Sequence, residues 1–367
     1  MKNKIFTLFF ALVASIGTMF AGVVKIGDLY YNLNTSSQTA EVTSQPNGVT
    51  VADIPSYVTY NALEYGVTSI GNLAFHGCQS LTSVTIPNSV VNIGGSAFSG
   101  CSNLLSVNLP EYITKISDGT FEYCAKLTYI NIPEGIDTIG SGAFSQCKSL
   151  ISISIPNNVT YIGHDAFGGC SSLTSVVIPN NVEGIENGTF AGCTNLASVM
   201  LPENLTWIGN FAFAECSNLT SITIPNKVEV IQYYAFQNDS NLTSLTLGSG
   251  LMEIGGAFTG CYKLMHITCF AIAPPILGTI SFQGKIYGVF DDIVYSNALL
   301  YVPAVSIDTY KVADQWKDFY NIYTINAEEI RVMPDEQKEN SRKFLRDGQI
   351  FILRGDKTYT LTSQEVK

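Results

Sequence analysis

Residues 139–150 read Ile-Gly-Ser-Gly-Ala-Phe-Ser-Gln-Cys-Lys-Ser-Leu, and this phrase returns along the chain with small changes. Aligned on its cysteine, the repeat is Ile-Gly-x-x-Ala-Phe-x-x-Cys-x-x-Leu-x-Ser-Val-x-Ile-Pro, and it occurs nine times between Val67 and Thr268. Seven cysteines lie 23 residues apart, at Cys78, Cys101, Cys124, Cys147, Cys170, Cys193 and Cys216. Six identical steps exclude chance, so one structural unit is repeated along this part of the chain.

A fixed period of about 20 to 29 residues with a repeated leucine pattern is typical of a leucine-rich solenoid. Within the repeat, Leu81-x-x-Val84-x-Ile86 alternates with polar residues, which predicts a short strand with its apolar side chains inward. The outward positions Ser83 and Thr85, and their counterparts, then form the presented surface. A proline follows most of these strands and ends them, because it has no N–H to donate.

The other side of each coil carries Ala74, Phe75 and Cys78, whose spacing predicts a short turn of helix with one apolar face. Together these patterns predict an α/β repeat: a leucine-rich-repeat solenoid of nine 23-residue coils, with a parallel sheet on the concave face and a cap at each end. A solenoid must cover its first and last apolar coils, so divergent caps are expected.

The N-terminal residues 1–21 have the pattern of a secretory signal peptide: Lys2 and Lys4, an apolar run from Ile5 to Val13, and small residues up to Ala21. The apolar run is too short for a membrane anchor, so we expect no membrane-spanning segment in the mature chain. Residues 22–66 are expected to form the N-terminal cap, and residues 67–268 the solenoid.

Residues 269–326 lack the repeat columns and are expected to form the C-terminal cap. Ser306 to Tyr320 has helical spacing with Ser306 as N-cap, and Trp316 and Phe319 are expected to be buried. Residues 327–367 change in composition and alternate like two or three short strands, with Gly348 and Gly355-Asp356 at turns. They are expected to form a small β segment or a tail.

The Ile-Gly-x-x-Ala-Phe-x-x-Cys phrase resembles the BspA-type leucine-rich repeat of bacterial surface and secreted proteins. This resemblance implies a cell-surface adhesin or host-protein interaction module, with no catalytic set to transfer. The C-terminal segment resembles β modules that some Gram-negative secreted proteins carry for export or attachment. We therefore expect a secreted or cell-surface protein, from a Gram-negative bacterium, that binds a host matrix or surface protein; a glycan-binding surface protein is the alternative.

Composition and cysteine usage exclude several other functions. The net charge is −11, and the repeats contain five lysines and no arginine against thirteen acidic residues, which argues against nucleic acid as a partner. Eight of the nine cysteines share one inward column, so we expect buried, reduced thiols rather than disulfides. The three histidines are scattered, and we expect no catalytic residues, no metal and no cofactor.

Candidate binding residues are those that break the polar rule of the outward columns. Tyr129, Val177 and Met200 stand where most repeats have Ser, Thr or Asn, and Asn131 lies beside Tyr129 on the same strand. Large side chains dominate binding energy where a partner desolvates them. In a further column next to each Ile-Gly pair, Tyr161 and Trp207 are candidates for the glycan alternative, with local packing as an equal possibility.

Overall fold

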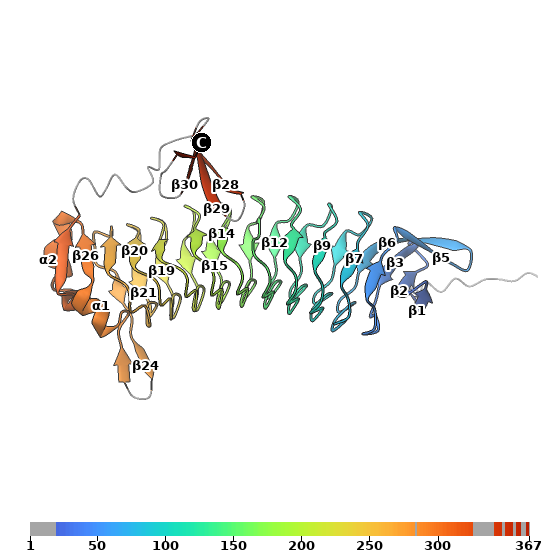
Figure 1. Cartoon of the computed structure of the whole chain (residues 1–367), viewed down its shortest axis with the longest axis horizontal. Helices are drawn as coiled ribbons and strands as arrows, with labels where there is room; N and C mark the ends of the chain where they lie inside the picture. Colours follow the sequence, from blue (N-terminus) through green and yellow to red (C-terminus); the bar gives the residue numbers. More distant parts are fainter. Residues whose placement is uncertain are drawn as a thin grey trace, which may run out of the picture.

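The computed structural model describes residues 20–282, 285–325, 341–346, 349–354, 357–360 and 365–366. It is an elongated parallel-strand β-solenoid of about twelve turns with a spacing of about 23 residues. Figure 1 shows the coils as one long row, with the N-terminal strands at one end and the helices of the C-terminal cap at the other. The signal peptide predicted for residues 1–21 lies almost entirely outside the described residues.

One ladder of strands runs the length of the molecule, and we call its exposed surface the strand face. Val84 and most of its counterparts point inward and are buried, with Val199 and Ile322 partly buried, while Ser83 and Thr85 point outward, as the alternation predicted. The ladder comprises β4 (Val51–Asp53), β7 (Ser83–Thr85), β9 (Ser106–Asn108), β11 (Tyr129–Asn131), β14 (Ser175–Val177), β16 (Ser198–Met200), β18 (Ser221–Thr223), β20 (Ser244–Leu247), β22 (His266–Cys269), β26 (Leu299–Val302) and β27 (Asn321–Thr324).

These strands pair in parallel as three sheets, β11-β9-β7-β4, β14-β16 and β18-β20-β22-β26-β27. The coil between β11 and β14 has no strand assigned at residues 152–154, although Ile153 is still buried. The nine sequence repeats therefore supply the middle of the ladder. Both caps extend it: β4 comes from the N-terminal cap, and β26 and β27 from the C-terminal cap.

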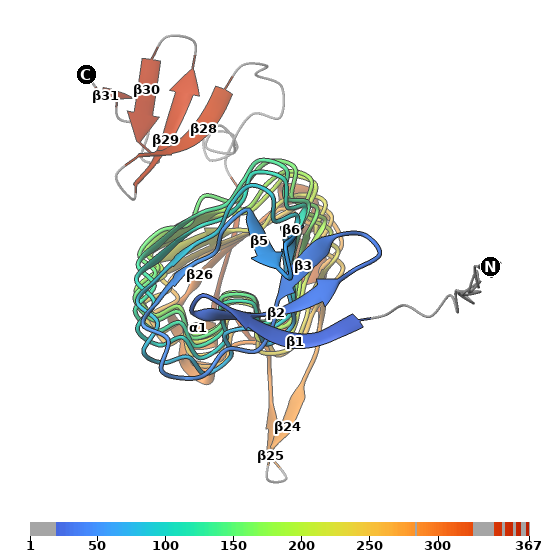
Figure 2. The same ribbon diagram turned by 90° about the vertical axis from the view of Figure 1, so that its right-hand side faces the viewer.

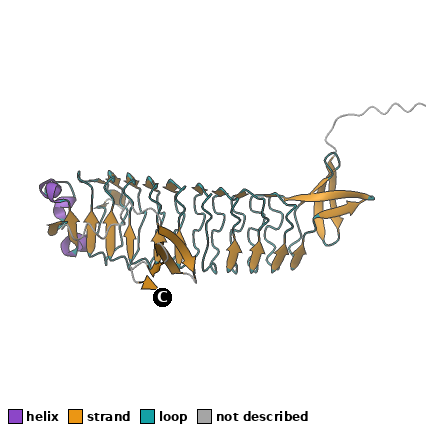
Figure 3. Cartoon of the chain, turned by 90° about the horizontal axis from the view of Figure 1, so that it is seen from above, coloured by secondary structure: helices purple, strands orange, loops and turns teal. Residues whose placement is uncertain are grey.

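A second ladder consists of two-residue strands, most of which end at the isoleucine of the Ile-Gly position of a repeat. Figure 3 shows strands along two sides of the row. It comprises β8 (Asn92–Ile93), β10 (Lys115–Ile116), β12 (Thr138–Ile139), β13 (Tyr161–Ile162), β15 (Gly184–Ile185), β17 (Trp207–Ile208), β19 (Val230–Ile231), β21 (Glu253–Ile254) and β23 (Ile276–Leu277). Each isoleucine of the Ile-Gly pairs is buried. The coil is thus held by inward side chains on two sides.

The third side of each coil, which we call the turn face, is not helical. Between Gly71 and Cys78 the chain makes successive turns, and alternate N–H groups leave the coil: those of Leu73, Phe75 and Gly77 donate to Gly95, Ala97 and Ser99 of the next coil at 3.0, 2.7 and 2.7 Å. Left-handed backbone at Leu73 (φ 59°) and Gly77 (φ 70°) makes this possible. The predicted turn of helix is therefore wrong, because a helix would direct these N–H groups along its own axis.

The predicted apolar column is nevertheless the core. Ten phenylalanine rings, from Phe75 to Phe258 and then Phe290, stack in one line with centroids 5.1 to 5.6 Å apart and planes within 12° of parallel. The nine repeat rings are all inaccessible to solvent. Each ring therefore depends on the coils before and after it for burial, which makes the stacking of coils the source of stability.

The cysteine column packs beside these rings. All nine cysteines are buried and free, and seven of the eight column thiols contact the phenylalanine carbonyl of the preceding coil, as Cys147 Sγ does with Phe121 O at 3.2 Å. Burial raises the pKa of these thiols, to about 12 for Cys101 and Cys193. They are packing groups with a weak hydrogen bond, as predicted, and not nucleophiles.

Asp239 takes the place of a cysteine in this column and is also inaccessible to solvent. Its Oδ1 accepts the Cys216 N–H at 2.8 Å, while Oδ2 has no partner among the described residues. Burial raises the pKa of this carboxyl group well above its ordinary value. The substitution therefore places in the core a carboxyl group that holds its proton more strongly in the folded than in the unfolded chain.

The N-terminal cap is a mixed sheet in the order β1-β2-β3-β6-β5. Its strands are β1 (Phe20–Ile26), β2 (Leu29–Asn34), β3 (Thr39–Val42), β5 (Tyr57–Tyr60) and β6 (Leu63–Ile70). The hairpin between β5 and β6 turns at Asn61 and Ala62, which are both left-handed (φ 50° and 63°), as a tight two-residue hairpin requires. β6 then pairs with β8, which attaches this sheet to the first coil.

The C-terminal cap contains one more, modified turn of the solenoid. Val289-Phe290 replaces Ala-Phe, and the Phe290 ring lies 5.4 Å from that of Phe258. A hairpin of β24 (Ile280–Phe282) and β25 (Lys285–Tyr287) is inserted before it and projects from the body (Figures 1 and 2). The block that lacks the repeat columns in the sequence therefore still follows the coil in space.

The predicted helix from Ser306 to Tyr320 is broken into η1 (Ala304–Ser306), α2 (Ile307–Tyr310) and η2 (Trp316–Asp318), and Ser306 makes no capping bond. The interruption has a reason: Gln315 adopts φ 58° and uses its buried amide to bond Val289 N at 2.9 Å and Leu277 O at 2.8 Å. Trp316 and Phe319 are buried, as predicted. The cap also contains α1 (Asp292–Asn297).

Near the C-terminus, four strands form an antiparallel sheet in the order β28-β29-β30-β31. They are β28 (Ser341–Arg346), β29 (Gln349–Arg354), β30 (Lys357–Thr360) and β31 (Glu365–Val366), one or two more strands than the sequence suggested. In Figure 1 this sheet lies beside the middle of the solenoid, and β29 is close to β14.

Replacing Phe144 by alanine should lower the free energy of unfolding by about 3 to 5 kcal/mol, because neighbouring rings held by their own coils cannot collapse into the space. Its ring lies 5.6 Å from Phe121 and 5.3 Å from Phe167. Urea melts followed by circular dichroism measure the loss. Tyr262→Ala, at an exposed position, is the control; a loss below about 1 kcal/mol at Phe144 would show that the ring stack does not carry stability.

Alkylation of the denatured, non-reduced protein should label nine thiols, since all nine cysteines are free. Intact mass spectrometry counts the labels. Finding four disulfides and a single labelled thiol would contradict the buried thiol column.

Replacing Asp239 by cysteine restores the column and should stabilise the protein at pH 7. Because the pKa of the Asp239 carboxyl is higher in the folded than in the unfolded chain, the folded state binds the extra proton, and wild-type stability is lost as pH rises above the unfolded value of about 4. The advantage of the variant should therefore grow by up to about 1.4 kcal/mol per pH unit from pH 4 upward. Urea midpoints between pH 4 and 8 test this, and an advantage that does not change with pH would contradict it.

Candidate functional site

The strand face near its N-terminal end presents the clearest of the predicted contact residues. On β11, Ile130 is buried, so the alternation turns Tyr129 and Asn131 outward; Tyr129 is 56 % exposed, and Asn131 is also exposed. The neighbours on β9 in register are Ser106 and Asn108. Tyr129 is therefore a large side chain that stands among small polar ones, as predicted.

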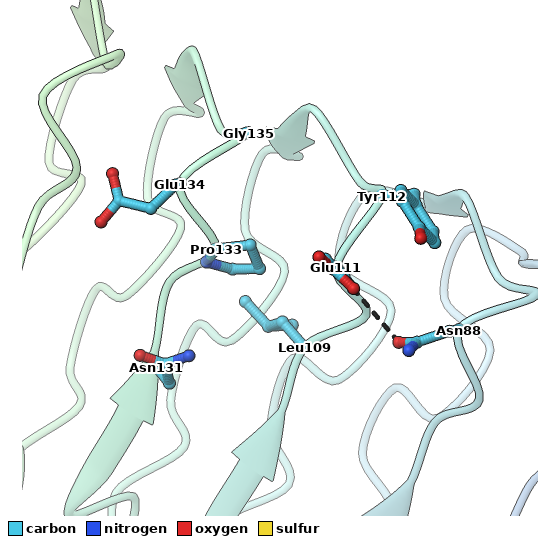
Figure 4. Close-up of a pocket in the computed structure, with 8 residues that line it drawn as sticks. All are labelled: Asn88, Leu109, Glu111, Tyr112, Asn131, Pro133, Glu134 and Gly135. Atoms are coloured by element: carbon cyan, nitrogen blue, oxygen red, sulfur yellow. Dashed lines mark hydrogen bonds between the residues drawn. The ribbon is translucent and has the colours of Figure 1, made fainter.

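A shallow depression joins Asn131 to residues that the sequence patterns did not single out (Figure 4). Asn88 Oδ1 accepts the N–H of Glu111 at 3.3 Å, and this bond links two successive coils beneath the depression. Tyr112 is 63 % exposed at its rim. The depression is lined by Asn88, Leu109, Glu111, Tyr112, Asn131, Pro133, Glu134 and Gly135.

Tyr112 could have been found from the sequence. It stands two residues after Pro110, where the other repeats place Ser89, Gly135 or an asparagine, with one lysine. Tyr112 is therefore the large side chain in the column after the proline, just as Tyr129 is the large side chain in its strand column.

Val177 and Met200 are less available than predicted. Both side chains are half-buried, and Ser175, which the alternation also places outward, is only 4 % exposed. β29 lies close to β14 at this point, so the middle of the strand face is not open along its whole width. The structure thus separates the candidates of this face: Tyr129 and Asn131 are open, whereas Val177 and Met200 are half-covered.

Tyr161 and Trp207 lie on the second ladder but do not form one exposed aromatic surface. Trp207 is half-buried, and its indole packs over Gly184, in the space that a Cβ at this glycine would occupy. Tyr161 is 40 % exposed, and burial, followed by the carboxylates of Glu186 and Asp118, raises the pKa of its hydroxyl. The packing alternative therefore holds for Trp207, while Tyr161 remains partly open.

The described residues contain no group of three or more histidine, cysteine or acidic residues arranged to hold a metal ion. His164 Nδ1 faces Glu186 at 3.4 Å, a contact that becomes an ion pair when the histidine is protonated. Asp291, part of an acidic pair in the sequence, is engaged internally, since its Oδ2 accepts the Gly260 N–H at 2.7 Å. These polar side chains thus form contacts between successive coils.

In the part of the chain that the structure describes, no helix is long and apolar enough to cross a membrane.

Two solved structures of bacterial leucine-rich repeat proteins are similar to this chain. A leucine-rich repeat protein from Bacteroides ovatus is 25 % identical with a TM-score of 0.58, and the match covers 82 % of this chain and 76 % of that one. The leucine-rich repeat protein of T. pallidum is 34 % identical with a TM-score of 0.48, over 52 % of this chain and 88 % of that one. No functionally curated protein matches the chain.

The sequence profile described as "BspA type Leucine rich repeat region" matches in six copies, over residues 68–182 and 160–285. These ranges cover more than half of the chain and coincide with the ring stack and the two strand ladders. The chain therefore belongs to the BspA-type leucine-rich repeat family.

Proposed function

We propose that the protein is exported to the bacterial cell surface or beyond and binds a partner protein through the N-terminal part of its strand face. The partner class that fits is a host matrix or surface protein. The observation that carries this proposal is the open group formed by Tyr112, Tyr129 and Asn131 on neighbouring coils, next to the depression of Figure 4.

Physical considerations support a protein partner for this group. Tyrosine offers a large apolar ring with a polar tip and loses little conformational entropy on binding, so exposed tyrosines are frequent centres of protein interfaces. The surrounding Ser, Thr and Asn side chains supply a polar rim that a partner surface can satisfy. Since successive coils repeat this surface, contacts add up along the solenoid without a deep pocket.

Support for export comes from two observations. Lys2 and Lys4 precede an apolar run of signal-peptide type, and the family resemblance is to bacterial surface and secreted proteins. The free cysteine column is compatible with export because each of its thiols is buried and bonded to a backbone carbonyl, where oxidants in solution do not reach it.

Two double variants separate the open from the covered part of the strand face. Tyr112→Asn with Tyr129→Ser restores the residues that other repeats have and removes both open rings, while Val177→Thr with Met200→Thr does the same in the half-covered part. Binding to a panel of purified extracellular-matrix proteins is measured by surface plasmon resonance. The first pair should weaken binding to the recognised protein by tenfold or more, as expected for hot-spot residues, and the second pair by much less.

Thermal midpoints of both double variants should stay near that of the wild type, because none of the four side chains belongs to the ring stack. Equal, wild-type affinity of both variants would refute the strand-face site. Loss of binding only in the second pair would move the site to β14 and β16.

A further inference from the structure

Two exposed aromatic residues and one half-buried one gather on the turn face, far from the strand-face group. They are Phe211, Tyr233 and Tyr234, from two successive coils; Phe211 is 44 % and Tyr233 41 % exposed. We propose that Phe211 and its polar neighbours Asp165 and Asn187 bind the sugar rings of a neutral oligosaccharide. This site is separate from the one under the proposed function and does not depend on it.

The geometry leaves one aromatic face open. The rings of Phe211 and Tyr234 are stacked, with centroids 4.8 Å apart and planes 13° from parallel. Tyr234 covers one face of Phe211, and the other face points toward the preceding coil, where the equivalent residue, Gly188, has no side chain that could stack on it. The face of an aromatic ring is electron-rich and attracts the positively polarised C–H groups of a sugar ring.

Two polar side chains lie next to Gly188, the position that precedes Phe211 in this column. The Asp165 carboxylate reaches across the coil into the space that a Cβ at Gly188 would occupy. The Asn187 Oδ1 accepts the N–H and the side-chain N–H of Asn210, at 2.8 and 3.2 Å. This fixes the amide, and its NH₂ group has no hydrogen-bond partner among the described residues, so it remains available to a ligand.

This combination selects hydroxyl groups over a cationic group. A hydroxyl both donates and accepts hydrogen bonds, so a sugar can donate to Asp165 and accept from Asn187 while its ring stacks on Phe211. A lysine or arginine side chain only donates; it would satisfy Asp165 and the aromatic face but leave the Asn187 NH₂ group without an acceptor. A saccharide is therefore the ligand that satisfies all three groups.

The backbone indicates that Phe211 and Tyr234 are not there for stability. Both occupy a left-handed position (φ 57° and 61°) that is glycine in several other coils, at Gly119, Gly142 and Gly188. A bulky residue is unfavourable in this conformation. An exposed ring at such a position costs conformational energy without filling the core, which is typical of a residue retained for contact with a ligand.

The surroundings extend the site along the solenoid. On the side of Asp165, the turn face is hollowed by a shallow depression lined by Ser96, Asp118, Gly119, Glu122, Ser141, Gly142, Ser145, His164 and Asp165. On the other side, the base of the β24–β25 hairpin limits the surface, since Ile280 fills the space over Gly256. A chain of sugars has room to run from Phe211 over the preceding coils, and the hairpin closes one end.

Isothermal titration of the full chain with cellohexaose, maltohexaose and mannohexaose tests the proposal, with hexalysine as the cationic competitor. At least one hexasaccharide should bind, and Phe211→Gly should weaken it at least tenfold. Leu73→Gly is the matched control, because Leu73 is exposed at the same left-handed position of the first coil. It should leave binding unchanged.

Two further measurements exclude a merely structural role. The thermal midpoint of Phe211→Gly should equal or exceed that of the wild type, since glycine prefers this backbone. Asn187→Asp keeps the acceptor for Asn210 but removes the donor, so it should weaken saccharide binding and strengthen any binding of hexalysine. The proposal is wrong if no hexasaccharide binds, if Phe211→Gly binds it as the wild type does, or if only hexalysine binds.

Discussion

The contact on which the whole structure depends is the one between successive coils. A single coil of about 23 residues cannot cover its own phenylalanine, and its alternate N–H groups on the turn face point out of the coil. The next coil meets both needs. It places another phenylalanine ring within stacking distance, and its carbonyl groups accept hydrogen bonds from these N–H groups. Each coil thus requires its neighbours, and the array ends only where other structure takes over these contacts.

The two ends meet this requirement in different ways. At the N-terminus the cap supplies β4 to one ladder and β6, a strand of its mixed sheet, to the other, so the first coil finds ordinary strand partners. At the C-terminus the ring stack continues to Phe290 and is then closed by Trp316 and Phe319, whose rings meet Phe290 edge-on. A change from parallel to perpendicular ring contacts is a physical way to stop a stack, because it leaves no open face for a further ring.

What the sequence could predict follows from the same constraint. Inward columns are set by burial, so Phe144, Cys147 and Ile139 could be placed from periodicity alone, and so could Tyr129 on the outside. The turn face is wrongly predicted as helix because Ala, Phe and Cys have the same spacing in a helix and in these turns. The difference lies in left-handed residues such as Tyr123 and Gln146, whose residue type, unlike glycine, does not indicate this conformation in the sequence. The half-burial of Val177 and the packing of Trp207 on Gly184 arise from neighbours outside the local pattern, which no column shows.

Because packing constrains the inward residues, functional residues are expected mainly among the outward ones. The energetic cost of each unusual residue can be judged against the residues that other coils have in the same column. Tyr129 and Tyr112 replace small polar residues on unstrained backbone, so they cost little and could arise easily. Phe211 and Tyr234 stand at a left-handed position that is glycine in three other coils, at Gly119, Gly142 and Gly188, so they cost more. Asp239 places a carboxyl group in the core, where its pKa is raised by burial and its second oxygen has no partner among the described residues. In a repeat protein, the residues at the same position of other coils show what each substitution replaces. An exposed aromatic residue on a strained backbone is therefore a stronger indicator of a binding site than an exposed residue on a relaxed backbone.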